Sequence, residues 1–138
     1  MKITDHILLV DNDEITLELA TRFLENAGYT VRATTRSSEA LEMLSHPGLK
    51  LVISEIELNH LTGFDLLAFT HKCQIDVPVV FLSHVDDPGT QTEASHLGVA
   101  AFLSKKAEFG ELPKVARALL SDVTSSNLPL RSELPDET

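Results

Sequence analysis

The sequence predicts an α/β protein built on a doubly wound, five-stranded parallel sheet with five helices. Short apolar runs alternate with segments of helical spacing from residue 6 to residue 121, and strict alternation of this kind is typical of βαβ units. The expected strands are almost continuously apolar, which favours a sheet covered by helices on both faces. A chain of 138 residues is long enough for one domain with its own core.

The first strand and helix carry the clearest signals. His6–Val10 is mostly apolar, and residues 11–28 then place apolar side chains at helical spacing. Asp13 is a natural N-cap for this helix, and Gly28 suits the position just after its C-terminal end.

The remaining elements continue the alternation. A weaker strand at 29–35 precedes a short helix at 37–48, for which Ser37 or Ser38 is the expected cap. Pro113 falls in the first turn of the last helix, where a missing N–H costs little. The other expected elements are, in order, a strand at Leu49–Ser54, a helix within 61–73, a strand at Pro78–Ser83, a helix at Thr90–Leu97, a strand at Ala101–Ser104 and a helix at Phe109–Ser121.

Composition narrows the functional class. The 11 Lys and Arg residues against 21 Asp and Glu residues give a net charge of −10, which repels a phosphate backbone, so direct nucleic-acid binding by this domain is not expected. No apolar run approaches the roughly 18 residues that a membrane span needs. The N-terminus does not read as a signal peptide and Cys73 is the only cysteine, so the expected location is the cytoplasm.

Four of the apolar runs end in polar side chains. Asp11-Asn12-Asp13 follow the first strand, Glu55 follows the third, Ser83 ends the fourth and Lys105 follows the fifth. The C-terminal ends of parallel strands share one edge of a sheet, so these groups should meet in a single pocket. Carboxylates, a hydroxyl and a lysine at one crevice indicate a site for a metal ion and a phosphoryl group.

These residues resemble the receiver domain of two-component response regulators, a phosphoacceptor module with a flavodoxin-like (CheY-like) fold. The resemblance covers about residues 5–121 and is carried by ILLVDNDE, Gly63-Phe64-Asp65, PVVFLS and GVAAFLSK. We therefore expect a receiver domain at 1–121. Residues 122–138 shift to Ser, Pro and acids, and we expect them to be a tail or the start of a linker.

The resemblance implies a role for each pocket residue. Glu55 falls on the phosphoacceptor aspartate. A divalent metal ion, usually Mg²⁺, would be held by Asp11, Glu55 and the backbone carbonyl of Glu57, with Asn12 at the second acidic position and Asp13 beside it as a helix cap or substitute ligand. Ser83 matches the hydroxyl that contacts a phosphoryl oxygen, Lys105 matches the lysine that pairs with it, and Phe102 matches the aromatic switch position, although a core aromatic is an equal alternative for Phe102.

Several of these positions depart from the family pattern. Glutamate in place of aspartate moves the carboxylate by about 1.5 Å, a large shift for in-line transfer, and Asn12 removes one charge and one ligand from the metal site. Asn59 and Lys106 stand where the family has proline. The sequence thus predicts a pseudo-receiver with a weakened Mg²⁺ site, which acts by binding a histidine kinase or a downstream signalling protein.

The longer carboxylate of Glu55 would also lie closer to Ser83 and Lys105, where it could partly stand in for a phosphoryl group. Two alternatives stay open: a response regulator phosphorylated on Glu55, and a Mg²⁺-dependent phosphoester hydrolase using Asp11 and Glu55, against which the short loops argue. In the family, the face made by the fourth helix, fifth strand and fifth helix binds partners and supports homodimers. His60 and His84 are interpreted as loop histidines at the pocket edge.

Overall fold

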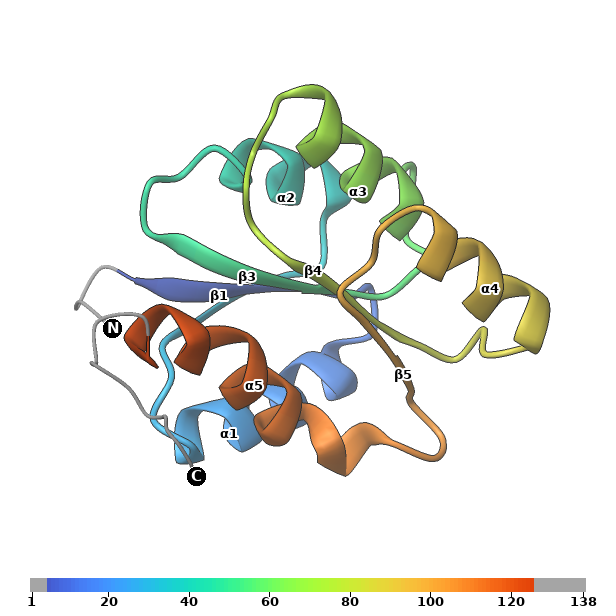
Figure 1. Cartoon of the computed structure of the whole chain (residues 1–138). Helices are drawn as coiled ribbons and strands as arrows, with labels where there is room; N and C mark the ends of the chain where they lie inside the picture. The colour runs from blue at the N-terminus through green and yellow to red at the C-terminus, as the bar shows by residue number, and fades with distance from the viewer. Residues whose placement is uncertain (1–4, 126–138) are drawn as a thin grey trace.

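Five parallel strands form the centre of the protein (Figure 1). The computed structural model describes residues 5–125, and in it the strands follow the order β2-β1-β3-β4-β5. This order places β1 and β3 side by side in the middle of the sheet, with β5 at one edge. The strands are β1 His6–Val10, β2 Val31–Thr34, β3 Leu49–Ser54, β4 Val79–Ser83 and β5 Ala101–Ser104.

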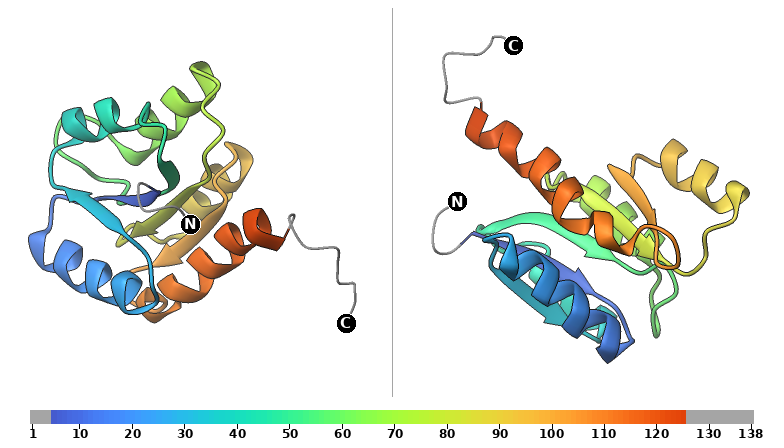
Figure 2. Two further views of the ribbon diagram at one scale, coloured as in Figure 1. Left: turned by 90° about the vertical axis from the view of Figure 1, so that its left-hand side faces the viewer. Right: turned by 90° about the horizontal axis from the view of Figure 1, so that it is seen from below.

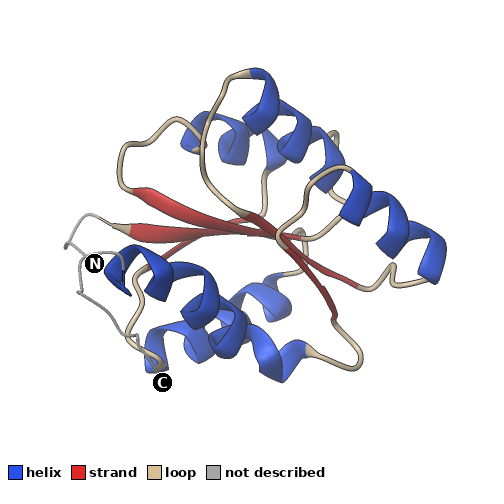
Figure 3. Cartoon of the chain, viewed as in Figure 1, coloured by secondary structure: helices blue, strands red, loops and turns tan. Residues whose placement is uncertain are grey.

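Helices cover both faces of this sheet, as the secondary-structure colouring in Figure 3 shows. α1 and α5 lie side by side on one face (Figure 2), and α2, α3 and α4 lie on the other. The predicted doubly wound five-stranded parallel sheet with five helices is confirmed. The helices are α1 Glu14–Asn26, α2 Ser37–Met43, α3 Gly63–Lys72, α4 Pro88–His96 and α5 Leu112–Ser125, the last preceded by a 3₁₀ turn at Phe109–Glu111.

The core is split by the sheet into two clusters, because successive side chains of a strand point to opposite faces. Ile7 and Leu9 of β1 pack with α1 and α5, whereas Leu8 and Val10 pack with α2, α3 and α4. These four side chains are at most 1% exposed. The burial of each side chain contributes about 1.5–3 kcal/mol to the stability of the fold, so the central strand is held from both sides.

Side-chain caps set where three of the helices begin. Asp13 caps α1, as predicted, by accepting from the Ile15 N–H at 3.3 Å. Thr62 and Asp65 form a reciprocal capping box at α3, and Asp87 caps α4 by accepting from the Thr90 N–H at 3.0 Å. Gly28 follows α1 with φ +101°, the left-handed conformation that glycine adopts without strain.

The starts of α2 and α4 differ from the sequence prediction. Arg36, not Ser37 or Ser38, is the N-cap of α2, and it makes no side-chain capping bond. Ser37 is instead buried and donates its hydroxyl to the Asn59 carbonyl. α4 starts at Pro88, earlier than predicted, because Asp87 already supplies the cap.

The last predicted helix is divided. Residues Phe109–Glu111 form the 3₁₀ turn, and α5 continues to Ser125 with Pro113 in its first turn. The predicted tail or linker at 122–138 lies mostly outside the described residues, since only 122–125 belong to α5.

Candidate functional site

The C-terminal ends of β1, β3, β4 and β5 bring four predicted residues together. Asp11 follows β1, Glu55 follows β3, Ser83 ends β4 and Lys105 follows β5. Because the strands are parallel and β3 lies between β1 and β4, their ends open onto one edge of the sheet. Asp11, Glu55 and Ser83 are 2%, 1% and 0% exposed, so two carboxylates lie within the protein.

Lys105 joins the two buried carboxylates. Its Nζ lies 2.7 Å from Asp11 Oδ2 and 2.9 Å from Glu55 Oε1. Burial by itself would lower the pKa of Lys105, but the hydrogen bonds to Asp11 and Glu55 outweigh that effect and raise it. The lysine is therefore held as an ammonium ion, and it compensates the negative charge of both acids.

Both carboxylate oxygens of Glu55 are occupied by donors. Oε2 accepts from the Ser83 hydroxyl and, at 2.6 Å, from the Ile56 N–H. Oε1 accepts from Lys105 and, at 3.0 Å, contacts His84 Nδ1. Burial disfavours the charged form, yet the hydrogen bonds from Lys105, Ser83 and His84 together lower the pKa of Glu55 to about 2. Glu55 is thus a fixed carboxylate at neutral pH.

Asp11 has fewer donors than Glu55. Its Oδ1 accepts from the Asp13 N–H at 2.9 Å, and its Oδ2 faces Lys105. Burial raises the pKa of Asp11, and these two contacts offset that rise only in part. The two acids share one lysine but differ in pKa direction, because Glu55 gains the additional donors Ser83 and His84.

The other two residues of the first acidic run lie outside this buried cluster. Asn12 and Asp13 are exposed. The Asp13 carboxylate turns towards the start of α1 and accepts from the Thr16 hydroxyl at 2.6 Å; this bond lowers the pKa of Asp13. Of the run Asp11-Asn12-Asp13, only Asp11 faces Lys105 and Glu55.

A glycine allows α3 to begin directly behind Glu55. The Gly63 N–H donates to the Ile56 carbonyl at 2.8 Å. A Cβ atom at residue 63 would lie 2.6 Å from the Glu55 carbonyl oxygen, which is closer than real Cβ atoms approach backbone, and 3.1 Å from Ile56 Cα. The Gly63-Phe64-Asp65 motif therefore fixes the loop that carries Glu55, Glu57 and Asn59.

His84, which the sequence places at the pocket edge without a role, is a site residue. Its imidazole lies between two carboxylates, with Nδ1 3.0 Å from Glu55 Oε1 and Nε2 2.9 Å from Glu57 Oε1. The hydrogen bond to Glu55 raises the pKa of His84, and both ring nitrogens can donate only in the imidazolium form. The signal for its role was its position immediately after Ser83, and His60, the other loop histidine predicted at the pocket edge, plays no part in these contacts.

Phe102 lies on β5 next to the pocket-forming end of the sheet. It is partly buried and packs edge-on against Phe81, with ring centroids 6.2 Å apart. Phe81 in turn packs against Phe64 of α3 at 5.1 Å. A row of three aromatic rings thus connects β5 to the helix that begins behind Glu55.

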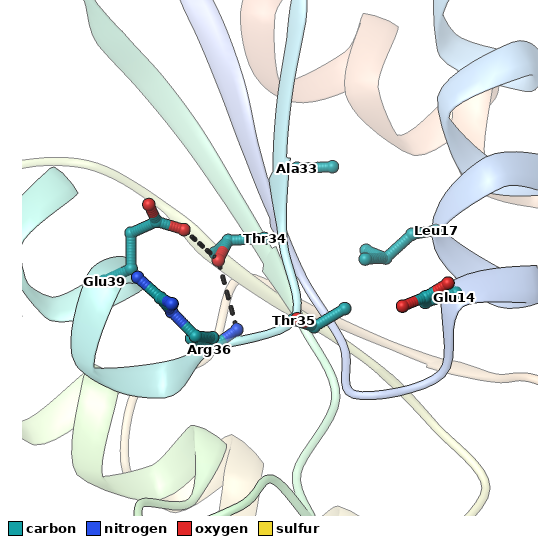
Figure 4. Close-up of a pocket in the computed structure, with 7 residues that line it drawn as sticks. All are labelled: Glu14, Leu17, Ala33, Thr34, Thr35, Arg36 and Glu39. Carbon is teal, nitrogen blue, oxygen red and sulfur yellow. Dashed lines mark hydrogen bonds between the residues drawn. The ribbon is translucent and has the colours of Figure 1, made fainter.

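A separate open pocket lies between α1, the end of β2 and the start of α2 (Figure 4). Within it the Thr34 hydroxyl donates to the Glu39 carboxylate and accepts from the Arg36 N–H at 3.1 Å. None of the residues that bind Glu55 lines this pocket. Its lining consists of Glu14, Leu17, Ala33, Thr34, Thr35, Arg36 and Glu39.

Across residues 5–125, no three His, Cys, Asp or Glu side chains are grouped so that they could hold a metal ion. Asp11 and Glu55, two of the predicted ligands, already hold the Lys105 ammonium between them. Glu57, the third, pairs with Thr62 in an isolated bridge and directs its carboxylate to His84.

No helix in the described part of the chain is both long and apolar enough to cross a membrane.

The parallel sheet with an acidic, lysine-bearing pocket at its strand ends defines a signalling domain of the flavodoxin-like class. Residues 7–117 match the response regulator receiver domain, and the chain belongs to that family. Members of this family act in two-component signal transduction. The resemblance predicted from the sequence is confirmed at the level of family, fold and signalling system.

Individual relatives agree with this assignment. The chain is 27% identical over 122 residues to the response regulator SaeR of Staphylococcus epidermidis, covering 88% of this chain and 53% of SaeR. It is 29% identical to the receiver domain of an HD domain-containing protein from Pseudomonas fluorescens, with a TM-score of 0.77 and coverage of 88% and 98%. A CheY-like receiver domain from Methanospirillum hungatei is 21% identical, with a TM-score of 0.78 and coverage of 88% and 98%. The chain spans about half the length of SaeR.

Proposed function

We propose that this chain is a pseudo-receiver in which Glu55 occupies the phosphoacceptor position and replaces the phosphoryl group in part. The observation that carries the proposal is that one carboxylate contacts both the Ser83 hydroxyl and the Lys105 ammonium. These are the two groups that the family resemblance assigns to a phosphoryl oxygen. The domain then adopts its signalling conformation without a phosphodonor.

The charge of Glu55 makes the replacement incomplete. A phosphoryl group adds about −1.5 to −2 charges and three acceptor oxygens, whereas Glu55 offers one charge and two oxygens. Two oxygens nevertheless suffice to contact both Ser83 and Lys105. The partly buried position of Phe102 against Phe81 fits a switch aromatic held on the inward side.

The same contacts argue against ordinary phosphorylation of Glu55. A carboxylate whose pKa is lowered to about 2 and whose oxygens accept from Ser83, Ile56 and Lys105 is a poor nucleophile, because attack would break these bonds. Asp11 and Glu55, two of the residues that would hold Mg²⁺, already share the Lys105 ammonium, so the proposed Mg²⁺ affinity is weak. No enzymatic turnover is proposed.

The proposed output is protein–protein recognition in the cytoplasm by a histidine kinase or a downstream signalling protein. The face formed by α4, β5 and α5 is the proposed contact and homodimer surface. α4 supports this assignment, because only Ala94 among its nine residues is buried. The net charge of −10 argues against nucleic acid as the direct ligand of this domain.

A phosphotransfer experiment tests the proposal. The chain is incubated with acetyl phosphate and Mg²⁺ beside Glu55→Asp, which restores the ordinary acceptor length, and mass is measured on the intact proteins. We expect phosphate on the Glu55→Asp variant and none on the unaltered chain. Stable phosphate on Glu55 would establish the phosphorylated alternative instead, and Mg²⁺-dependent phosphoester turnover that Asp11→Ala abolishes would establish the hydrolase.

A second experiment examines the conformation directly. In Glu55→Gln the amide keeps the shape of the side chain but removes the charge that Lys105 compensates. We expect the NMR signals of Ser83 and Phe102 to shift, because both positions depend on the carboxylate. Unchanged signals would refute the proposed replacement of a phosphoryl group.

A further inference from the structure

We propose that His84 is a positioning residue that holds the Glu55 carboxylate in contact with Ser83 and Lys105 at the same time. The inference rests on the proposed role of Glu55 and names a further residue on which that role depends. His84 follows Ser83 directly, so it lies in the loop that begins where the strand supplying the hydroxyl ends. Its ring contacts Glu55 Oε1 at 3.0 Å through Nδ1, and its N–H lies 3.3 Å from the same oxygen.

A glutamate at this position needs such a support. Its side chain has one more rotatable bond than aspartate, and fixing a glutamate costs up to about 2 kcal/mol of side-chain entropy. Oε2 is fixed by Ser83 and by the Ile56 N–H, which lies two residues past the end of β3. Oε1, by contrast, has Lys105 as its only other side-chain partner, and the flexible lysine also binds Asp11.

Glu57 orients the histidine from the outer side. Its Oε1 lies 2.9 Å from His84 Nε2, and its backbone is held in a bridge with Thr62. With one ring nitrogen fixed on Glu57, the other points inward at Glu55. The imidazole therefore connects the loop after β3 to the loop after β4, and it aims the donor that Glu55 Oε1 receives.

Two isosteric substitutions separate the two contacts of the ring. In His84→Asn the side-chain amide nitrogen lies near the position of Nδ1, so the bond to Glu55 is retained and the bond to Glu57 is lost. In His84→Gln the amide nitrogen lies near the position of Nε2, so the bond to Glu57 is retained and the bond to Glu55 is lost. His84→Ala removes both, and His71→Ala, on the exposed surface of α3, is the control.

Amide NMR signals of the full chain give the readout. The Ile56 N–H reports on Glu55 Oε2, and the Val85 N–H, which donates to Ser83 Oγ at 3.0 Å, reports on the serine hydroxyl. We expect His84→Ala and His84→Gln to move both signals by at least half of the displacement that Glu55→Gln causes. His84→Asn and His71→Ala should leave both signals near their original positions, and all four variants should remain folded by thermal unfolding.

The outcomes separate the two proposals. If Glu55→Gln itself moves neither signal, the role proposed for Glu55 is wrong. If Glu55→Gln moves them but His84→Ala does not, the role of Glu55 stands and that of His84 is refuted. The role of His84 would also be refuted if His84→Gln, and not His84→Asn, kept the two signals in place, or if neither variant did. In either case the contact between His84 and Glu55 would not be the one that holds the carboxylate.

Discussion

Replacing Lys105 by methionine is the sharpest test of the charge balance in the pocket. Methionine retains most of the stem of the side chain and removes only the ammonium group. Asp11 and Glu55, 2% and 1% exposed, then lose the cation that lies 2.7 and 2.9 Å from them. Two buried carboxylates would face one another without the ammonium group that joins them.

The expected loss of stability follows from the burial of the three groups. Removing one partner of a buried ion pair costs about 3–5 kcal/mol. The Lys105 side chain is 18% exposed, so water reaches its end and the lower value applies, about 3 kcal/mol at pH 7.5. For a domain of this size, that loss corresponds to a fall in Tm of about 10 °C.

Urea unfolding at pH 7.5 and pH 5 measures the loss and its cause. Without the lysine, the paired carboxylates have raised pKa values in the folded protein, so lowering the pH stabilises the variant and the difference from the unaltered chain shrinks. The double substitution Lys105→Met with Glu55→Gln should regain more than about 1 kcal/mol, because one buried charge is gone. Lys106→Met, at the exposed neighbour, is the matched control. A loss below about 1 kcal/mol, or one that does not shrink at pH 5, would refute the reasoning.

Three further predictions concern single positions. Gly63→Ala should lower the free energy of unfolding by about 2–3 kcal/mol in urea titrations, because its Cβ would lie 2.6 Å from a backbone oxygen; a loss below 0.5 kcal/mol would contradict the close approach. His60→Gly should raise stability by about 1 kcal/mol, since His60 has φ 75° and glycine adopts that conformation freely; a destabilised variant would contradict it. Because the pKa of Glu55 is lowered from 4.5 to about 2, its ionisation should add about 3 kcal/mol to the free energy of unfolding above pH 4.5, and this contribution is lost as the pH falls towards 2. In an acid titration, the stability of Glu55→Gln should therefore fall less steeply than that of the unaltered chain. Identical slopes for the two proteins would count against the prediction.

The fold was predictable because its signals are local. Each strand is a short apolar run, and the helices have helical spacing and, at Asp13 and Gly28, capping residues that the structure confirms. The start of α2 was not predictable in the same way. Serine is a frequent N-cap, but Ser37 is drawn inward by the Asn59 carbonyl, a partner that only the tertiary structure supplies.

The candidate site was predictable where it depends on strand ends. The topology alone brings Asp11, Glu55, Ser83 and Lys105 to one edge. His84 was placed at the pocket edge but its role was not predicted, because its contacts depend on the side-chain directions of Glu55 and Glu57, and spacing in the sequence does not give those. Asn12 and Asp13 adjoin Asp11 in the chain, yet the turn into α1 directs them to the solvent.

The ion pair between Lys105 and Asp11 also affects how the chain folds during its synthesis. Asp11 and Glu55 leave the ribosome long before β5, and β5 is the edge strand of the sheet. Until the segment that ends in Lys105 has docked, the partly made sheet carries two carboxylates and lacks their cation. A chain interrupted before residue 101 would retain this imbalance, so the pocket makes the native fold conditional on a complete final strand.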